Sequence, residues 1–125
     1  MNYKLPYDYI LSYLYPLRPE IKKTFGCYGL ILNHKIVMLL REKESQPEFN
    51  GVFVATRPEY YDALGKELHS SNMEFDIDGN HHTWLFISED LHDFDELIRK
   101  AAELVKGGDE RIGKELPPKR KPKKL

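Results

Sequence analysis

The sequence predicts an α+β domain in which a mainly antiparallel sheet of about five to six strands is flanked by three helices. Short apolar runs separated by turn residues indicate strands that are joined by hairpins. Apolar residues recur at helical spacing near the start, in the middle and toward the end of the chain. No regular alternation of strand and helix appears, so a parallel sheet is not expected. Hydrophobic residues make up 41% of the chain and charged residues 31%, a balance typical of a globular protein.

The first helix is predicted to begin around Pro6, because a proline in the first turn loses no hydrogen bond that the helix needs. Pro16 and Pro19 should end it. Tyr9 and Tyr13 lie off the apolar stripe, so part of their surface should be exposed. The residues that form the stripe, at the spacing of one buried helix face, are Tyr7, Ile10, Leu11 and Leu14.

Four strands are predicted to follow the first helix. Asn33-His34 should form a two-residue hairpin turn, because Asn and His tolerate the positive φ that such turns require. The segment Glu42 to Asn50 is polar and is predicted to be a loop. The strands are expected over Ile21 to Phe25, Tyr28 to Leu32, Lys35 to Arg41 and Val52 to Thr56.

The second helix is predicted to start at a capping box, with Thr56 as the N-cap and Glu59 reaching back to it. The helix should run to about His69. Gly65 lies inside it and marks either a point of close packing or a weak point, since glycine costs about 1 kcal/mol relative to alanine there. The side chains expected to be buried are Tyr60 or Tyr61, Leu64 and Leu68.

A last hairpin and a last helix complete the domain. The strands Phe75 to Ile77 and Thr83 to Ile87 flank Asp78-Gly79-Asn80, a strong turn signal. Asp93 should cap the last helix, with Glu96 completing a second capping box. Gly107-Gly108 should stop the helix. Its apolar stripe consists of Phe94, Leu97, Ile98, Ala101, Leu104 and Val105.

The charge is distributed unevenly along the chain. The whole chain has a formal charge of −1, but residues 114–125 carry six Lys or Arg and one acid, or +5, so residues 1–113 carry −6. We therefore predict a single domain over 1–113 and a basic, disordered tail over 114–125, which has too few apolar residues to offset its ordering entropy. The candidate phosphate contacts of this tail are Lys119, Arg120, Lys121, Lys123 and Lys124.

The segment from Ile21 to Leu30 (Ile-Lys-Lys-Thr-Phe-Gly-Cys-Tyr-Gly-Leu), which precedes a hairpin, resembles the opening of the TfoX N-terminal domain family. Members typically have a basic residue, a Met-Phe-Gly-Gly-like turn, then Gly and an apolar strand. Thr24 stands here where Met is usual, and Cys27 where a second Gly is common. Gly51 to Ala55 resembles the family's second hairpin strand, although many members have a lysine where this chain has Ala55 or Thr56.

The strand Trp84 to Ile87 and the helix Asp93 to Val105 also resemble this family and the related MmcQ/YjbR group. The resemblance extends from about Pro6 to Val105 and implies an α+β fold of this element order. Some relatives regulate natural competence, and DNA binding has been proposed for the MmcQ/YjbR group. The chain is expected to lack the second, C-terminal domain of full-length TfoX-type regulators.

Phe25, Gly26, Cys27, Tyr28 and Gly29 form the most unusual local string and are the candidate binding motif. The two glycines could let a ligand approach the backbone, or they could permit a tight bend while the aromatic residues pack. No phosphate-loop or dinucleotide fingerprint surrounds them. The thiol of Cys27 could be a nucleophile, but no accompanying Cys/His signature is present, which favours a buried structural thiol.

No metal, cofactor or catalytic residue is expected. His81 and His82 are adjacent in a predicted strand and would point to opposite faces, and Asp76 to Asn80 lacks the remaining ligands of a calcium loop. The other histidines, His34, His69 and His92, match no zinc pattern. The carboxylates before and in the last helix are Glu89, Asp90, Asp93, Asp95 and Glu96; they favour a helix cap over acid–base chemistry.

These observations favour a small, non-enzymatic, TfoX N-terminal-like regulatory or protein-binding module, whose partner is another protein. Weak, non-specific nucleic-acid binding through the basic tail is the first alternative. A small-molecule or enzymatic site around Phe25 to Gly29 is the second. The oligomeric state stays open.

Contact with a membrane is not expected, because the longest stretch without a charged residue or histidine, residues 24–33, is far below the length of about 20 residues that a span needs. The N-terminus meets an acid and a proline before any apolar run, so no signal peptide is expected. With a single cysteine, the chain is expected to be cytoplasmic.

Overall fold

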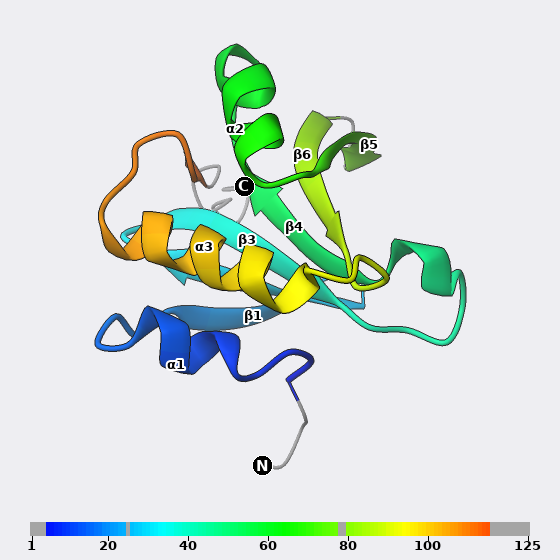
Figure 1. The fold of residues 1–125 in the computed structure, drawn as a ribbon, viewed down its shortest axis with the longest axis horizontal. Helices are drawn as coiled ribbons and strands as arrows, with labels where there is room; N and C mark the ends of the chain where they lie inside the picture. The colour runs from blue at the N-terminus through cyan, green and yellow to red at the C-terminus, as the bar shows by residue number, and fades with distance from the viewer. Residues whose placement is uncertain (1–4, 25, 78–79, 116–125) are drawn as a thin grey trace, which may run out of the picture.

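The computed structural model describes residues 5–24, 26–77 and 80–115, and for residues 24, 72–77 and 80–83 it describes the backbone only. The fold is α+β, as predicted: an antiparallel sheet with three helices (Figure 1). The helices are α1 (Ile10–Leu14), α2 (Tyr61–Glu67) and α3 (Phe94–Lys106), and the strands are β1 (Glu20–Thr24), β2 (Cys27–Leu32), β3 (Lys35–Arg41), β4 (Gly51–Ala55), β5 (Ser71–Ile77), β6 (Asn80–Ser88) and β7 (Lys114–Glu115).

The strands follow the order β1-β2-β3-β4-β6-β5 across the sheet, and every neighbouring pair is antiparallel. Asn33 and His34 join β2 to β3 with φ of 52° and 65°, which confirms the predicted hairpin turn. A register shift between Leu30 and Ile31 interrupts the β2–β3 ladder. The predicted element order, with four strands between the first two helices and a hairpin before the last helix, is confirmed.

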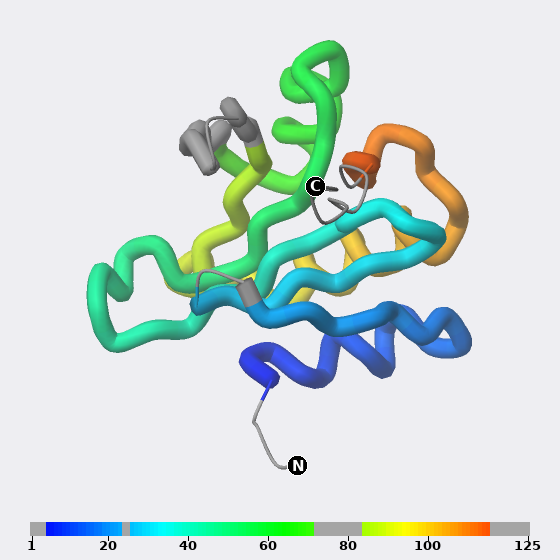
Figure 2. Tube along the Cα trace, turned by 180° about the vertical axis from the view of Figure 1, so that it is seen from behind, coloured from blue at the N-terminus to red at the C-terminus, as the bar shows by residue number. Residues whose placement is uncertain are grey.

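Helices α1 and α3 lie side by side on one face of the sheet (Figure 1). Figure 2 shows the opposite side, where the strands lie in front of α3. Buried side chains from all three helices, among them Ile10, Leu64 and Ile98, pack against strand residues such as Leu40 and Leu85 in the main core. We call the side of the sheet that packs against this core the helix-covered face. Of the helices in the described residues, none has the length and apolar character that crossing a bilayer requires.

The opposite face of the sheet has its own cluster of buried side chains, all of them from β3, β4 and β6. Leu39 pairs with Phe53 and Phe53 with Phe86 in register, so these three side chains form a row across the strands. The rings of Phe53 and Phe86 are 4.7 Å apart between centroids. We call this the second face; its cluster consists of Leu39, Phe53, Ala55, Trp84 and Phe86.

The starts of the helices differ from the sequence predictions. Helix α1 begins at Ile10 rather than around Pro6, because Tyr7 has a φ of 52° and residues 6–9 form turns. The capping box at Thr56 is wrong: the Thr56 hydroxyl donates to the carbonyl of Arg111, 2.7 Å away, and α2 begins only at Tyr61. A 3-10 turn, Pro58–Tyr60, leads into the helix instead.

The last helix also lacks its predicted capping box. Asp93 occupies the N-cap position, but its side chain makes no capping hydrogen bond and bonds instead to His69. The helix ends at Lys106, and Gly108 has a φ of 79°, in agreement with the predicted glycine stop. The buried positions of α3 are Phe94, Leu97, Ile98, Ala101 and Ala102.

The first two residues of the predicted tail are part of the sheet. Lys114 and Glu115 form β7, which pairs with the beginning of β3 beside the end of β4. The amide of Gly113 donates to the carbonyl of Ala55, 2.8 Å away, and guides the chain to this position. Sequence patterns do not reveal this strand, because two charged residues show no periodicity. The proposed phosphate contacts over residues 119–124 lie outside the described residues.

Candidate functional site

The predicted binding motif forms the turn between β1 and β2. Thr24 pairs with Cys27 at the end of the β1–β2 ladder, and Phe25 lies outside the described residues. Gly26 has a φ of 76°, in the left-handed region that favours glycine. This geometry supports the interpretation of the glycine as a requirement of the bend.

Gly29 and Cys27 lie on the second face of the sheet. A Cβ atom at Gly29 would lie 3.0 Å from Cδ1 of Ile36 and 3.5 Å from Cδ2 of Leu39, so the glycine allows close packing on β3. Cys27 is half-buried and packs against the second-face cluster. Burial raises the pKa of its thiol, although Lys43 and Arg41 act in the opposite direction. A raised pKa keeps the thiol protonated at neutral pH, which favours a structural role over a nucleophilic one.

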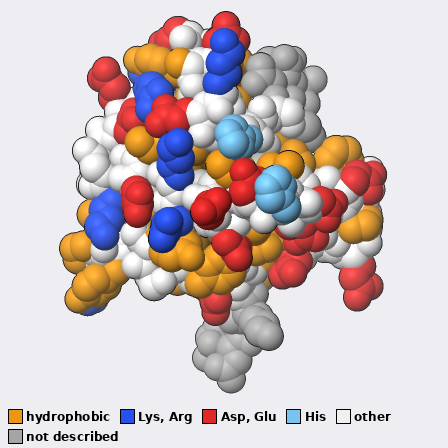
Figure 3. All heavy atoms as spheres, viewed as in Figure 1, with side chains coloured by type: hydrophobic (Ala, Val, Ile, Leu, Met, Phe, Trp, Pro, Cys, Tyr) orange, Lys and Arg blue, Asp and Glu red, His pale blue; other side chains and the backbone are white. Residues whose placement is uncertain are grey.

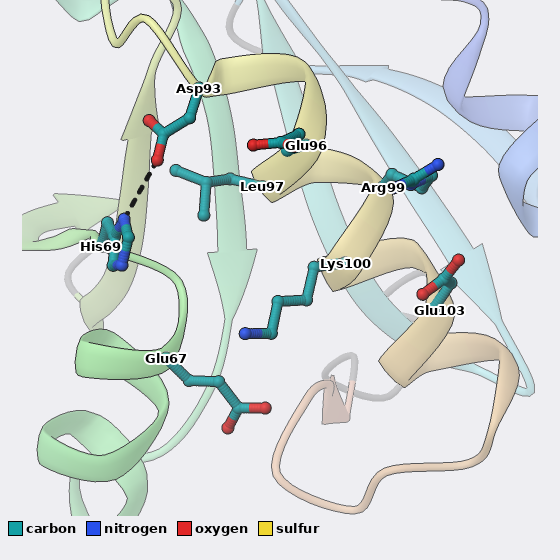
Figure 4. Close-up of a pocket in the computed structure, with 8 residues that line it drawn as sticks. All are labelled: Glu67, His69, Asp93, Glu96, Leu97, Arg99, Lys100 and Glu103. Atoms are coloured by element: carbon teal, nitrogen blue, oxygen red, sulfur yellow. Dashed lines mark hydrogen bonds and ion pairs between the residues drawn. The ribbon is translucent and has the colours of Figure 1, made fainter.

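A groove of about 400 Å³ lies between the end of α2 and the solvent side of α3 (Figure 4). The residues that line it come from two segments that are far apart in the sequence. None of them is a serine, threonine or cysteine. They are Glu67, His69, Asp93, Glu96, Leu97, Arg99, Lys100 and Glu103.

His69 and Asp93 join the two walls of this groove. His69 follows the C-terminal end of α2 with a φ of 49°, a left-handed conformation that turns the chain out of the helix. Its Nδ1 atom lies 3.2 Å from Oδ2 of Asp93, immediately before α3. The imidazole is 62% exposed, whereas the carboxylate is 20% exposed. The pair thus connects the end of α2 to the start of α3 and presents polar atoms at the surface of the groove.

Charges of both signs line the rest of the groove. Glu67 pairs with Arg111 at 3.1 Å, and Figure 4 shows Lys100 extending from α3 toward α2. Asp109 also pairs with Arg111, at 2.8 Å, and the hydrogen bonds from this guanidinium hold the pKa of the Asp109 carboxyl below its usual range. Four acids and two permanent cations line the groove, a mixed pattern that suits a protein surface better than a phosphate backbone.

Exposed tyrosines lie at the two ends of α1. Tyr9 is 39% exposed and Tyr15 is 62% exposed, and the ring of Tyr13 lies edge-to-face against the ring of Tyr9, with the centroids 6.0 Å apart. The hydroxyl of Tyr9 donates to Oδ1 of Asp95 on α3, 2.8 Å away. We call Tyr9, Tyr13 and Tyr15 the tyrosine surface. Figure 3 shows hydrophobic side chains grouped at the lower part of this face, below the charged side chains of α3.

The described histidine and carboxylate side chains form no metal site. No group of three or more His, Cys, Asp or Glu side chains is arranged among the described residues to hold an ion. His34 and His92 are exposed. The side chains of Asp76, His81 and His82, and the turn residue Asp78, lie outside the described residues. Glu89 accepts a hydrogen bond from the hydroxyl of Tyr7 at 2.6 Å and so holds the N-terminal segment against the domain.

No protein-family model, curated protein or solved structure matches this chain. The assignment to the TfoX N-terminal family therefore stays a prediction.

The sequence did not reveal the groove, because its walls meet only through the tertiary fold. His69 and Asp93 are 24 residues apart, and each has a local interpretation as a helix terminus. Arg111 follows the predicted glycine stop and gives no periodic signal. The tyrosine surface, by contrast, was indicated by Tyr9 and Tyr13 lying off the apolar stripe of the first helix.

Proposed function

We propose that the protein is a non-catalytic, protein-binding module with a regulatory role, of the TfoX N-terminal type, and that its partner docks on the helix-covered face. The tyrosine surface is the observation that carries this proposal. Tyrosine is enriched at protein interfaces because it combines a large apolar area with a polar tip at a low entropic cost. Tyr9 and Tyr15 are the large hydrophobic side chains most exposed in the part of the chain that the structure describes.

The surroundings of the tyrosine surface suit a protein partner. Tyr9 is already held by Asp95 and by the ring of Tyr13, so binding loses little side-chain entropy there. The α2–α3 groove adds charges of both signs, which supply specificity for a partner with a complementary pattern. Acidic residues on this face, among them Asp95 and Glu103, oppose the approach of a nucleic acid.

The experiment compares capture of host proteins by the full-length chain and by two variants. The test variant combines Tyr9→Ser with Tyr15→Ser, and the control is Tyr60→Ser, which removes a tyrosine near α2. Circular dichroism shows whether each variant is folded. We expect a specific protein to be captured by the wild type and the control and to be lost with the test variant. Calorimetry with the purified partner should then show a loss of affinity of at least about tenfold, the effect of removing an interface anchor.

Two results would count against this function. Capture that is equal for all three proteins would show that the tyrosine surface is not the interface. Capture that disappears after nuclease treatment would favour a nucleic acid bound through the basic tail. Thermal-shift screening with metabolites tests the remaining alternative, a small-molecule site near the Gly26 turn.

A further inference from the structure

Arg57 and Tyr60 show how this protein holds a cation against an aromatic ring. The guanidinium carbon of Arg57 lies 5.1 Å from the ring centroid of Tyr60, and Nη2 of Arg57 donates to the Tyr60 hydroxyl at 3.2 Å. A carboxylate completes the arrangement, because Nε of Arg57 lies 3.6 Å from Oε2 of Glu59. The ring face and the carboxylate both attract the positive charge. A tyrosine with an acid beside it is therefore a place where this protein accommodates an arginine.

The tyrosine surface contains the same two components. The rings of Tyr9 and Tyr13 meet at an interplanar angle of 77°. Asp95 accepts the hydrogen bond from the Tyr9 hydroxyl and is itself exposed, so its carboxylate is accessible to a partner. In the part of the chain that the structure describes, no Lys or Arg lies over the ring of Tyr9, Tyr13 or Tyr15. These ring faces and the neighbouring acid are thus available to a cation from another protein.

Further carboxylates surround Tyr9. Burial, the hydrogen bond to Asp95 and the negative charges of Asp95 and Glu42 raise the pKa of Tyr9. Burial raises the pKa of Tyr7 as well, together with the carboxylates of Glu89 and Glu42. Acids from three separate segments therefore act on the same region of the surface. Figure 3 shows acidic side chains to the right of its centre, where α3 begins, and basic side chains to the left and above.

We infer that the tyrosine surface docks a basic protein segment, in which an arginine side chain lies against the rings of Tyr9 and Tyr13 and pairs with Asp95. The inference rests on the proposed function and names the chemistry of the partner. Arginine suits the surface better than lysine, because its planar guanidinium stacks on a ring and forms two parallel hydrogen bonds to a carboxylate.

The charge of the domain agrees with a basic partner. Residues 1–113 carry a formal charge of −6, which attracts a positively charged segment before contact is made. An acidic segment would be repelled by Asp95 and Glu42, and an apolar segment would cover these carboxylates without compensating their charge. Charge complementarity therefore selects a basic occupant for this surface.

The experiment titrates the full-length, ¹⁵N-labelled protein with a short synthetic peptide of alternating arginine and serine residues at low salt. The amide signals of Tyr9, Tyr13 and Asp95 should shift, and the affinity should fall as salt is added. A peptide with lysine in place of arginine should bind more weakly, because it loses the stacking and the paired hydrogen bonds. A peptide with glutamate in place of arginine should not bind.

Two variants test the two components of the surface separately. Asp95→Asn removes the charge and keeps an acceptor for the Tyr9 hydroxyl, and Tyr9→Leu removes the ring and keeps apolar bulk. Each should weaken binding of the arginine peptide about threefold or more. The control is Glu110→Gln, which makes the same charge change at an exposed acid outside this surface and should leave the affinity unchanged. Circular dichroism verifies folding, and Tyr13→Leu replaces Tyr9→Leu if that variant unfolds.

The outcomes separate this inference from the proposed function. The inference is overturned if the arginine peptide does not bind, if the glutamate peptide binds equally well, or if Asp95→Asn and Glu110→Gln weaken binding equally. None of these results affects the capture of a host protein through Tyr9 and Tyr15. Conversely, capture that survives the double serine variant would reject the proposed function, whereas a loss of peptide affinity in Asp95→Asn and Tyr9→Leu would still support the arginine site.

Discussion

Among the described residues, nineteen buried hydrophobic residues from the three helices, the sheet and the segments beside them form the core of the helix-covered face, whereas five residues, all from strands, form the cluster of the second face. The first face is built by amphipathic helices, whose apolar spacing is visible in the sequence. In the second-face cluster, by contrast, no described helix takes part. The two faces of one sheet can therefore be equally buried while only one of them is recognisable from the sequence.

The largest effect should come from the helix-covered face. Leu85 is fully buried there, so Leu85→Ala should lower the free energy of unfolding by about 2–5 kcal/mol. Phe86 is the next residue of β6 and points to the second face. We expect Phe86→Ala to cost less than Leu85→Ala, because no described helix packs over Phe86. Urea denaturation of the two variants measures both costs, and an equal or larger cost for Phe86→Ala would contradict this difference between the faces.

The next largest effect should come from the loop between β3 and β4. Asn50 is 4% exposed, and its Oδ1 accepts hydrogen bonds from Nη1 of Arg41 at 2.8 Å and from the amide of Lys43 at 2.9 Å. Asn50→Ala leaves these donors without their acceptor and should cost about 1–3 kcal/mol in urea denaturation. Ser45→Ala is the control, because Arg41 bonds the carbonyl of Ser45 and not its side chain. A cost for Asn50→Ala no greater than that of the control would show that the loop is not held by this network.

The third prediction concerns the hydroxyl of Tyr7, which ties the N-terminal segment to the domain. Its hydroxyl donates to Glu89 at 2.6 Å and to the carbonyl of Arg41 at 3.2 Å, so Tyr7→Phe should cost about 1–2 kcal/mol. Burial, reinforced by Glu89, raises the pKa of Tyr7 above its usual value. The contribution of the hydroxyl is then complete below about pH 10, the pKa in the unfolded chain, and is lost as the pH rises further.

Urea denaturation at pH 8 and above pH 10 measures this dependence, with Tyr15→Phe as the exposed control. The difference in stability between the wild type and Tyr7→Phe should decrease at the higher pH. A difference that is independent of pH would contradict the proposed role of the hydroxyl.

The parts of the fold that could be predicted depend on a few neighbouring residues. The Asn33-His34 turn and the stop at Gly108 depend on backbone preferences of a few residues, and both appear as predicted. The two capping boxes failed because the side chains found distant partners, the carbonyl of Arg111 for Thr56 and the imidazole of His69 for Asp93. Capping residues compete with tertiary hydrogen bonds, and a sequence pattern does not include those competitors.

The tyrosine surface could be predicted from neighbouring residues, whereas the α2–α3 groove could not. The exposure of Tyr9 was predictable, because it depends on the position of one residue around a helix. The groove and the second face required the tertiary fold, since His69 meets Asp93 and Lys114 meets Trp84 only after the elements have packed. Pairs of this kind are separated by long stretches of chain and leave no local trace in the sequence.

The smallest effect should come from Asp109, which helps to hold the segment that leads to the second face. Its carboxylate accepts hydrogen bonds from Nε and Nη2 of Arg111, and this pairing lowers its pKa. Asp109→Asn should cost less than about 1 kcal/mol at pH 7, because ion pairs near the surface contribute little. The contribution is present above the pKa of about 3.9 in the unfolded chain and is lost as the pH falls below it. Urea denaturation should therefore show a difference between the wild type and Asp109→Asn at pH 7 that becomes smaller at pH 3, whereas Glu110→Gln should match the wild type at pH 7.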